Sequence, residues 1–410
     1  MTTNNQRKIF TVFAGRKKNI DVQKKYLEKA IQMGLIDEVH YWNITRNKLD
    51  EDYLKSISNL KRSSSTNYNY IQINPIIINN TFELNVKTTN DIHIKISNRI
   101  NNYEIVIGGW TNTKSVVREN DVEIYSIRTT GICIPTKHIN IQINCSNNKL
   151  YVNVNGEQII SVWIDMFIIN DIYFKTGHGS IANLKYDVIE NKGFYFMDTC
   201  IKNWSNYYTW YVDYEYTDDI IFKSDDDILF FDLKKFQKYV DFINSNNYDA
   251  VFANIINNGV AAYFQQNKLN LIPKSLMELE YPIGGECGTL WKSGIMAENL
   301  HTYFIENYLK FINSDFNSIY YKIDTRFSIN FFGFKGKNWY KIKDAGQKDD
   351  EYNLTIEGVK TKGFNNVMYA DFFVSHLSFY KQEETKINSE LIRNKYEQLA
   401  LVYLSNMENI

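Results

Sequence analysis

The sequence predicts an α/β domain that is interrupted by an antiparallel β-sandwich. Residues 1–60 read as strand, helix, strand and helix, which is the pattern of a parallel sheet covered on both faces. Residues 77–189 consist almost entirely of short stretches in which apolar and polar residues alternate, and from residue 190 the mixture of strands and helices returns. We therefore predict one α/β domain formed by residues 1–76 and 190–410, with residues 77–189 inserted into it.

The first elements are defined by their apolar pattern. The stretches KIFTVFAG and DEVHYWNIT predict two buried strands. Between them, NIDVQKKYLEKAIQMG predicts an amphipathic helix that ends at Gly34. DEDYLKSISNL predicts a second helix, with acidic residues in its first turn. The apolar face of the first helix consists of Val22, Tyr26, Ala30 and Met33.

The inserted region follows a polar, Ser-rich stretch, KRSSSTNYN, that predicts a linker. Segments such as FELNVKT, IHIKIS, YEIVIGG and INIQINC then alternate with the two-residue period of a half-buried strand. VNGE between two such segments predicts a hairpin turn. Many short strands separated by turns favour a β-sandwich.

The α/β pattern of the C-terminal part is carried by three segments. TDDIIFKSDDDILFFDLKKFQKYVDFI predicts a strand, an acidic turn and then a helix, and YDAVFANIIN predicts a further strand. KIDTRFSINFFGFKG predicts a helix that begins near Asp324 and carries Phe327, Phe331 and Phe334 along one side.

Three consecutive carboxylates, Asp225, Asp226 and Asp227, follow the apolar run Ile220–Phe222. Carboxylates about 5–6 Å apart repel by roughly 3 kcal/mol per pair at an effective dielectric constant near 20, so a cation is expected to offset them. Because residues i and i+2 of an extended segment face the same way, Asp225 and Asp227 can share one Mg²⁺ or Mn²⁺ ion beyond the end of the strand. The alternative is a solvated acidic turn that caps the following helix.

The turns after the first two strands are candidates for a nucleotide site. Ala14 and Gly15 permit close approach of a ligand to the backbone, and Arg16 is suited to phosphate. Asn43 or Arg46, after the second strand, is placed to contact a base or a ribose. An ordinary strand-to-helix turn is the alternative at both places.

Three further segments have two interpretations each. Glycines such as Gly284 and Gly285 in YPIGGECGTLW either line a ligand or form a hairpin turn. Asp324 is either a helix N-cap or a general base, and His376 is either a core residue or a metal ligand. Three consecutive acidic residues at 349–351, the acidic trio, either form a solvated loop or supply an alternative catalytic carboxylate to Asp324.

The order of these segments resembles the common core of glycosyltransferases with the GT-A fold, over residues 1–76 and 190–410. The run Asp225–Asp227 resembles the D-x-D motif, IGGECGTLW resembles the glycine-rich loop, and KIDTRFSINFFGFKG resembles the helix that begins with an x-E-D motif. The chain has Ile323 where that motif has glutamate. His376 resembles the C-terminal metal ligand of the family.

This resemblance implies a metal-dependent transferase that moves a sugar from a nucleotide sugar, commonly a UDP-sugar, to a hydroxyl group of a glycan or protein. Asp225, Asp227 and His376 would hold Mn²⁺ or Mg²⁺. Asp324 would act as the base in an inverting enzyme, with residues 349–351 in reserve, whereas a retaining enzyme needs no such base. The nucleotide site would comprise Ala14, Gly15, Arg16, Asn43, Asp225 and Asp226, and the sugar site would comprise Gly284, Gly285 and Glu286.

A second resemblance concerns the inserted region. It rests on the stretches YEIVIGGWTNTKSVVR, LYVNVNGEQIISVW and DIYFKTGHGS, which resemble the farnesoic acid O-methyltransferase-like domain, a lectin-like β-sandwich. Because the stretches offer no methyl-donor site, the resemblance implies a binding module for glycans, with Trp110, Arg118 and His178 as candidate lining residues. The Asn-, Ile- and Lys-rich composition and this pairing of domains resemble proteins of a giant virus or of a similar eukaryotic microbe.

The composition argues against several other classes of protein. A net charge of -1 over 410 residues argues against a nucleic-acid binder and against a binder of anionic membranes. The sequence contains no apolar run of about 18 residues, so we predict no membrane span. The apolar run near the N-terminus is too short for a secretory signal. The 4 cysteines show no C-x-x-C spacing, so we expect reduced thiols and a cytoplasmic protein, in the host cytoplasm if the protein is viral.

Two other functions fit the same residues. A sugar nucleotidyltransferase also uses aspartates at a strand end and a metal ion, but it releases pyrophosphate. A non-enzymatic, glycan-binding structural protein would act through the inserted region alone.

Overall fold

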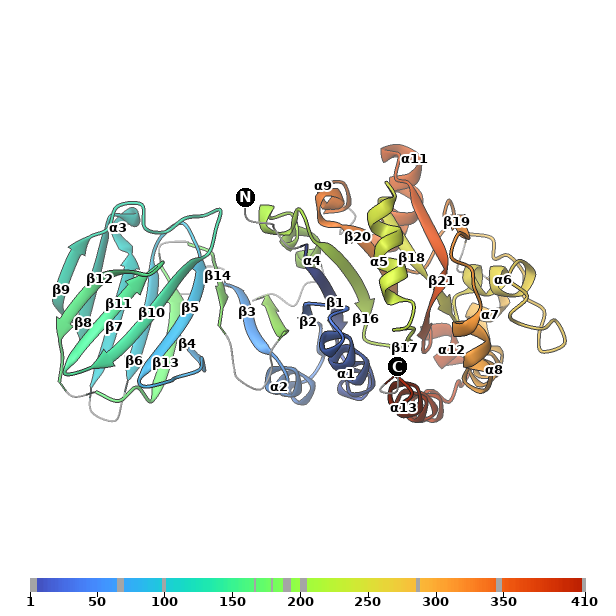
Figure 1. The fold of residues 1–410 in the computed structure, drawn as a ribbon, viewed down its shortest axis with the longest axis horizontal. Coiled ribbons are helices and arrows are strands. Elements are labelled where there is room, and N and C mark those ends of the chain that lie inside the picture. The colour runs from blue at the N-terminus through green and yellow to red at the C-terminus, as the bar shows by residue number, and fades with distance from the viewer. Residues whose placement is uncertain are drawn as a thin grey trace. The chain divides into compact units, whose positions relative to one another are not determined.

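The chain folds into two compact units (Figure 1). The first unit consists of Met1–Glu51 and Asn203–Ile410, and the second consists of Asp52–Lys202. The predicted insertion, residues 77–189, lies inside the second unit. The computed structural model describes residues 6–64, 70–97, 101–165, 167–177, 180–186, 193–199, 205–284, 288–343 and 349–407.

The first unit is built on a mixed sheet. β1, β2 and β16 run parallel to one another, as do β18 and β21, whereas β20 runs antiparallel to β16 and β18, and β17 runs antiparallel to β21. The parallel pairing predicted for the first two strands is confirmed, and β17 and β20 make the sheet mixed. The strand order is β2 (Glu38–Asn43), β1 (Lys8–Ala14), β16 (Ile220–Asp225), β20 (Phe331–Lys335), β18 (Ala250–Ile256), β21 (Asn366–His376) and β17 (Ile228–Phe231), with β19 (Tyr320–Lys322) paired to β21.

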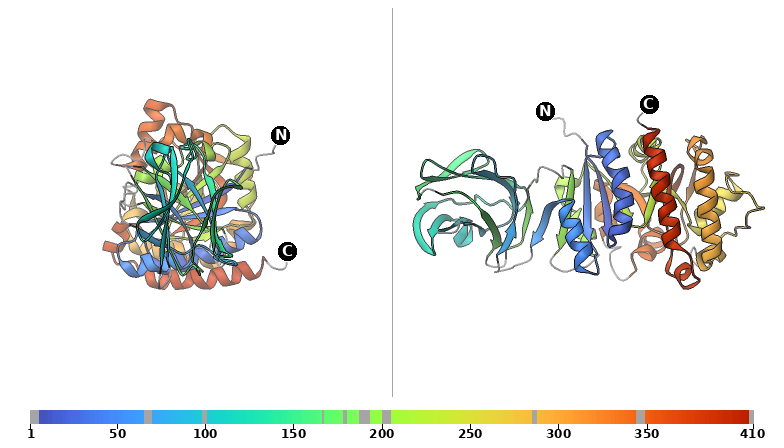
Figure 2. Two further views of the ribbon diagram at one scale, coloured as in Figure 1. Left: turned by 90° about the vertical axis from the view of Figure 1, so that its left-hand side faces the viewer. Right: turned by 90° about the horizontal axis from the view of Figure 1, so that it is seen from below.

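Helices cover both faces of this sheet (Figure 2). Phe372 of β21 stacks on Tyr239 of α5, while the next residue, Phe373, packs edge-on against Phe311 of α8. Since consecutive residues of a strand point to opposite faces, α5 and α8 lie on opposite sides of the sheet. The helices are α1 (Lys17–Gln32), α4 (Ser205–Trp210), α5 (Phe236–Ser245), α6 (Gly259–Asn267), α7 (Thr289–Lys292), α8 (Gly294–Asn313), α9 (Trp339–Ile342), α10 (Asp350–Tyr352), α11 (Gly358–Lys362), α12 (Tyr380–Glu384) and α13 (Ser389–Ser405), and α2 (Lys48–Ser56) spans the division between the units.

Most elements predicted for the first unit are confirmed. α1 buries Val22, Tyr26 and Ala30, and Gly34 follows its end with a φ of +68°. Met33 is the exception, because it caps the helix and is exposed.

Two predictions about the C-terminal part are wrong. No helix begins at Asp324, since β19 ends at Lys322 and β20 begins at Phe331, where its phenylalanines pair with β16 and β18. The acidic turn is followed by the short strand β17 before helix α5 begins. In both cases a place in the sheet decides the conformation of an apolar run that is compatible with helix or strand.

The second unit is the predicted β-sandwich. One of its two sheets has the order β4 (Ile71–Ile73), β13 (Asp171–Thr176), β6 (Ile92–Ser97), β7 (Asn102–Gly108), β8 (Lys114–Glu119) and β9 (Val122–Arg128). A single helical turn, α3 (Gly109–Asn112), connects β7 to β8. The two sheets share one apolar core. The other sheet has the order β12 (Glu157–Trp163), β11 (Lys149–Val154), β10 (Ile139–Ser146), β5 (Thr81–Lys87), β14 (Ala182–Lys185), β3 (Asn59–Ser64) and β15 (Phe194–Thr199).

Local details of the sandwich follow from the sequence, with one correction. The predicted hairpin is confirmed, because Asn155 and Gly156 join β11 to β12 with φ values of 51° and 83°. The predicted Ser-rich linker is wrong as far as Ser64, since residues 61–64 belong to β3, and its remainder lies outside the described residues. Cys133 and Cys145 are buried free thiols, and burial raises the pKa of each to about 12. Among the described residues no helix combines the length and apolar character that a membrane span requires.

Candidate functional site

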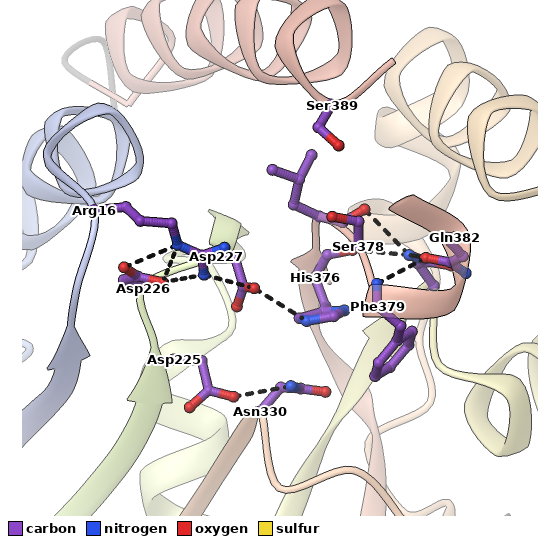
Figure 3. A network of polar contacts seen from close by, with 12 residues as sticks. Arg16, Asp225, Asp226, Asp227, Asn330, His376, Ser378, Phe379, Gln382 and Ser389 are labelled. Atoms are coloured by element: carbon purple, nitrogen blue, oxygen red, sulfur yellow. Dashed lines mark hydrogen bonds and ion pairs between the residues drawn. The ribbon is translucent and has the colours of Figure 1, made fainter. Parts of the chain in front are cut away.

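Four strand ends meet at one edge of the sheet in the first unit. β1 and β16 run parallel with Phe13 opposite Asp225, so the residues that follow both strands leave the sheet side by side. β17 pairs with β21 so that Ile228 lies opposite His376, which brings the end of β21 to the acidic turn. Figure 3 shows the resulting group of polar side chains, named the strand-end cluster: Arg16, Asp225, Asp226, Asp227, Asn330 and His376.

Asp226 points toward the beginning of α1. The backbone N–H of Gly15 donates to Oδ2 of Asp226 at 2.9 Å, and Nε of Arg16 donates to Oδ1 at 3.1 Å. A Cβ atom on residue 15 would lie 3.3 Å from Oδ2 of Asp226 and 3.5 Å from the carbonyl oxygen of Ile44, so glycine permits this close approach. Burial raises the pKa of the Asp226 carboxyl group.

Asp227 lies between the side chains of Arg16 and His376. Nη2 of Arg16 donates to Oδ2 of Asp227 at 2.8 Å, and Nε2 of His376 lies 3.4 Å from the same oxygen. Burial opposes the charge of Asp227, but His376 and Arg16 outweigh it and hold the pKa of this carboxyl group well below its usual range. Oδ1 of Asp227 and Nδ1 of His376 are both buried without a hydrogen-bond partner.

Asp225 faces a different set of partners. Nδ2 of Asn330 donates to its Oδ2 at 2.9 Å, and Nζ of the buried Lys223 donates to its Oδ1 at 2.5 Å. Lys223 also donates to the carbonyl oxygen of Ile329 at 2.7 Å. Figure 3 shows the carboxylates of Asp225 and Asp227 separated, with Asp227 directed to His376 and Asp225 directed to Asn330.

The predicted metal ligands fit a divalent cation by their chemistry, although their side chains are not gathered around one point. Among the described residues, no three or more His, Cys, Asp or Glu side chains lie close enough together to hold a metal ion. Carboxylate oxygen and imidazole nitrogen are nonetheless suitable ligands for Mn²⁺ or Mg²⁺, and Asp227 and His376 each have a buried atom without a partner. A cation bound to Asp227 would compete with Arg16.

The residues predicted to bind a nucleotide lie at adjacent strand ends. Ala14 ends β1 and is buried, and its carbonyl oxygen accepts from the N–H of Ile44, next to Asn43. Oδ1 of Asn43 accepts from the N–H of Thr45 at 3.2 Å and from its hydroxyl group at 2.6 Å. The side-chain oxygen of Asn43 therefore shapes the turn after β2.

Asp324 lies near the glycine-rich segment. Burial and the charge of Asp324 raise the pKa of Tyr281, which precedes Gly284. The N–H of Ile323 donates to the carbonyl oxygen of Asn366, the first residue of β21, whereas His376 is the last. The predicted sugar-site residues Gly285 and Glu286 lie outside the described residues.

Two functional candidates were not predicted as part of this cluster. Lys223 is a lysine within an apolar strand, and that position in the sequence was a signal of a buried charge pair. Asp350 belongs to the acidic trio, and the hydroxyl group of Tyr208 donates to its Oδ2 at 2.9 Å. Burial raises the pKa of Asp350, with the charges of Lys223 and Asp225 acting on it in opposite directions. Asp350 therefore lies within electrostatic reach of the strand-end cluster.

The second unit has a separate polar site around Trp110 and Arg118. Trp110 is 46% exposed, and Cζ of Arg118 lies 5.8 Å from the centre of its indole ring. His178, the third residue predicted there, lies outside the described residues.

Comparison with known families confirms the predicted resemblance of the inserted region. Residues 64–187 match the family model described as "Farnesoic acid 0-methyl transferase". The match does not reach the first unit, so the resemblance of that unit to GT-A glycosyltransferases stays a prediction. No curated protein matches the chain.

Solved structures similar to this chain include several with names that refer to carbohydrates. The galectin LEC-6 of Caenorhabditis elegans is 10% identical, with 30% of this chain and 94% of that chain covered and a TM-score of 0.21. The carbohydrate binding module CBM66 from Bacillus subtilis is 11% identical, with 31% and 96% covered and a TM-score of 0.22. A lichenase from a mouse hindgut metagenome is 10% identical, with 28% of this chain and 65% of that chain, just under two thirds, covered and a TM-score of 0.21. Similarity at this level carries no argument about function.

Proposed function

We propose that the first unit is a metal-dependent glycosyltransferase that moves a sugar from a nucleotide sugar, with a UDP-sugar as the expected donor, to a hydroxyl group of a glycan or protein. The observation that carries this proposal is the strand-end cluster, in which Asp227 is in contact with both His376 and Arg16. Ligands of open α/β sheets bind beyond the carboxyl ends of strands, where this cluster lies.

The cluster offers groups for both the diphosphate and its counter-ion. The side chain of Arg16 is 54% exposed, so it is free to exchange a carboxylate for a phosphate oxygen. Asp225, Asp227 and His376 would hold Mn²⁺ or Mg²⁺, with Asp225 turning from its present partners. When bound, such an ion neutralises the charge that develops on a departing diphosphate. Gly15 lets Asp226 approach the backbone closely beside the same site.

We assign the role of base in an inverting reaction to Asp350 ahead of Asp324. Asp350 belongs to the acidic trio at residues 349–351, which is the predicted alternative to Asp324 for this role. The charges of Lys223 and Asp225 act on it, whereas Asp324 lies beside the beginning of β21. An inverting reaction needs its base across the sugar ring from the leaving diphosphate, near the metal site but not at it, and Asp350 lies within reach of the charges of Lys223 and Asp225 without being one of the proposed metal ligands.

The test is release of UDP from a panel of UDP-sugars by the full chain, with Mn²⁺ and with EDTA. We expect one donor to be hydrolysed only with Mn²⁺, and the double variant Asp225→Asn/Asp227→Asn to be slower by roughly 100-fold or more. Absence of both turnover and binding for every donor would overturn the proposal. Release of pyrophosphate from a nucleoside triphosphate and a sugar phosphate would instead identify a nucleotidyltransferase.

A second candidate function is glycan binding by the second unit without catalysis. The family match to residues 64–187 and the exposed Trp110 beside a charged network favour it. This function does not require the strand-end cluster, so it would persist in the Asp225→Asn/Asp227→Asn variant.

A further inference from the structure

The six-stranded sheet of the second unit carries a polar network on the face opposite its core. In β7, Tyr103, Ile105 and Ile107 belong to the core of the sandwich. Because side chains alternate along a strand, Glu104 and Val106 point to the other face. Charged residues of the neighbouring strands lie beside Glu104 on that outer face of the sheet.

Glu104 holds this network in a fixed geometry. Nη1 of Arg118, on β8, donates to its Oε2 at 2.7 Å, and Nδ1 of His93, on β6, lies 3.0 Å from its Oε1. The hydroxyl group of Tyr70 also donates to Oε1. Burial opposes the charge of Glu104, but the hydrogen bonds from His93, Tyr70 and Arg118 outweigh it and hold its pKa well below the usual range. Arg118 and His93 are thereby oriented by an ionised carboxylate.

A hollow lies beside the network. Its volume is about 150 Å³. Its lining combines carboxylate, imidazole, guanidinium and aromatic groups, from Asp91, His93, Val106, Gly109, Trp110 and Arg118.

Asp91 is a buried acceptor in this lining. It is 2% exposed, and its Oδ2 has no hydrogen-bond partner. A buried carboxylate oxygen without a partner costs free energy that a bound hydroxyl group would recover. A Cβ atom on residue 177 would lie 3.3 Å from Oδ2 of Asp91 and 3.2 Å from Nε2 of His93, so Gly177 keeps both atoms uncrowded.

Trp110 is held beside the hollow by strained backbone. Trp110, Thr111 and Asn112 have φ values of 52°, 57° and 59°, which is the left-handed region that costs an L-residue about 1–2 kcal/mol. Nζ of Lys114 lies 4.7 Å from the centre of the indole ring, and Trp110 is nevertheless an exposed residue. Strain of this kind gathers at ligand sites. The turn α3 therefore presents a large aromatic surface next to the unpartnered carboxylate.

We infer that this hollow binds a neutral saccharide, with a sugar ring against the indole of Trp110 and its hydroxyl groups bonded to the polar side chains of the lining. A sugar ring presents an apolar C–H face, and its hydroxyl groups both donate and accept. Arg118 and His93 supply donors, and Asp91 supplies an acceptor. The charge of Arg118 is already balanced by Glu104, so a neutral ligand suits the hollow better than an anion.

A second hollow extends the site along the same sheet. Its volume is about 190 Å³, and Arg118 lines both hollows. The site can therefore accept a second sugar next to the first. The other lining residues of the second hollow are Tyr70, Lys95, Asn102, Glu104, Asp121 and Lys175.

This inference rests on the second candidate function, glycan binding, and not on sugar transfer. The test uses the full chain and the neutral disaccharides lactose, cellobiose, maltose and chitobiose, with sialyllactose as the anionic comparison. Binding at millimolar concentration is measured by saturation-transfer NMR and by calorimetry. The variants are Trp110→Ala, which removes the stacking surface, and Gly177→Ala, which adds a methyl group between Asp91 and His93.

The matched control is Trp163→Ala. Trp163 is 70% exposed on β12, and Nζ of Lys149 lies 4.3 Å from its ring centre, as Lys114 does at Trp110. Thermal unfolding establishes that each variant folds. Gly177→Ala removes no core side chain, so the test does not depend on Trp110→Ala alone.

We expect at least one neutral disaccharide to bind. Trp110→Ala and Gly177→Ala should weaken it about tenfold or more, while Trp163→Ala and Asp225→Asn/Asp227→Asn leave it within about twofold. Binding that survives both site variants would overturn the site but leave glycan binding intact. Binding of sialyllactose alone would overturn the choice of a neutral ligand. Absence of binding to every disaccharide would overturn both the inference and the second candidate function.

Discussion

Nε2 of His376 lies 3.4 Å from Oδ2 of Asp227, although the two residues are 149 positions apart in the chain. The imidazole ring packs against Phe379, with the ring centres 4.4 Å apart, and its Nδ1 is buried without a partner. Packing on one side and Asp227 on the other fix this histidine at the end of β21.

Replacing His376 by alanine should lower the affinity for the metal ion more than it lowers the affinity for the donor. Because His376 is proposed to share a cation with Asp227, we expect His376→Ala to raise the Mn²⁺ concentration for half-maximal UDP release by roughly 10–100-fold. The measurement is a Mn²⁺ titration at saturating donor. His93→Ala, in the second unit, is the control and should leave the titration unchanged. An unchanged titration in His376→Ala would remove His376 from the metal site.

Arg16 should stabilise the protein in the absence of metal. Its guanidinium group is the counter-charge of two carboxylates, Asp226 and Asp227, so Arg16→Ala leaves them without it. Removing the partner of a buried charge lowers the free energy of unfolding by several kcal/mol. Because Arg16 is half-exposed, we expect a smaller loss of about 1–3 kcal/mol. We expect a lower midpoint of thermal unfolding, and a larger rise on addition of Mn²⁺ than in the wild type.

The control for this prediction is Lys18→Ala. Lys18 pairs with Glu390 at 3.0 Å on the surface, and such exposed pairs contribute about 0–1 kcal/mol. Equal responses of Arg16→Ala and Lys18→Ala to Mn²⁺ would show that Arg16 does not occupy the position of a cation.

The parts of the fold that the sequence predicted are those in which one local pattern decides. The periodicity of α1 predicted its buried face, and the Asn155–Gly156 pair predicted the turn between β11 and β12, because few residues adopt positive φ at low cost. The second resemblance, which concerned the inserted region, is confirmed by the family match at residues 64–187.

The parts that the sequence did not predict depend on tertiary position. Phe331–Lys335 forms a strand because it lies between β16 and β18, and no local pattern states that. We expected Asp225 and Asp227 to face one point because we assumed an extended segment, but the chain turns after Asp225. As a result Asp226 and Asp227 share Arg16, and Asp225 faces Lys223.

Two carboxylates compete for the role of base, and their variants separate them. We expect Asp350→Asn to lower kcat by roughly 100-fold or more with little change in donor KM, because the acceptor hydroxyl group would lose its proton acceptor. Asp324 is exposed and lies beside the beginning of β21, so Asp324→Asn should remain close to wild type. The measurement is the initial rate of transfer to an acceptor. The reverse order would restore the assignment made from the x-E-D resemblance, and full rates in both variants would indicate transfer without a base.

Asp232 should make the stability of the first unit depend on pH. It is fully buried, its Oδ2 has no hydrogen-bond partner, and burial raises its pKa to about 7. In the unfolded chain this group titrates near pH 3.9, so between about pH 4 and pH 7 the folded state holds a proton that the unfolded state has lost. The stability that this proton provides is fully present below pH 4 and is lost as pH rises through 7.

Asp232→Asn cannot ionise and should therefore lose less stability than the wild type between about pH 5 and pH 8, by roughly 2–4 kcal/mol in the free energy of unfolding. The measurement is urea unfolding of both proteins across this range, with the differences compared at each pH. Asp241→Asn is the control, because Asp241 is exposed on α5 and accepts from Gln237 at 2.8 Å. Parallel pH profiles for the wild type and Asp232→Asn would show that Asp232 is ionised in the folded protein, and that Lys235, whose charge acts on Asp232, outweighs the effect of burial.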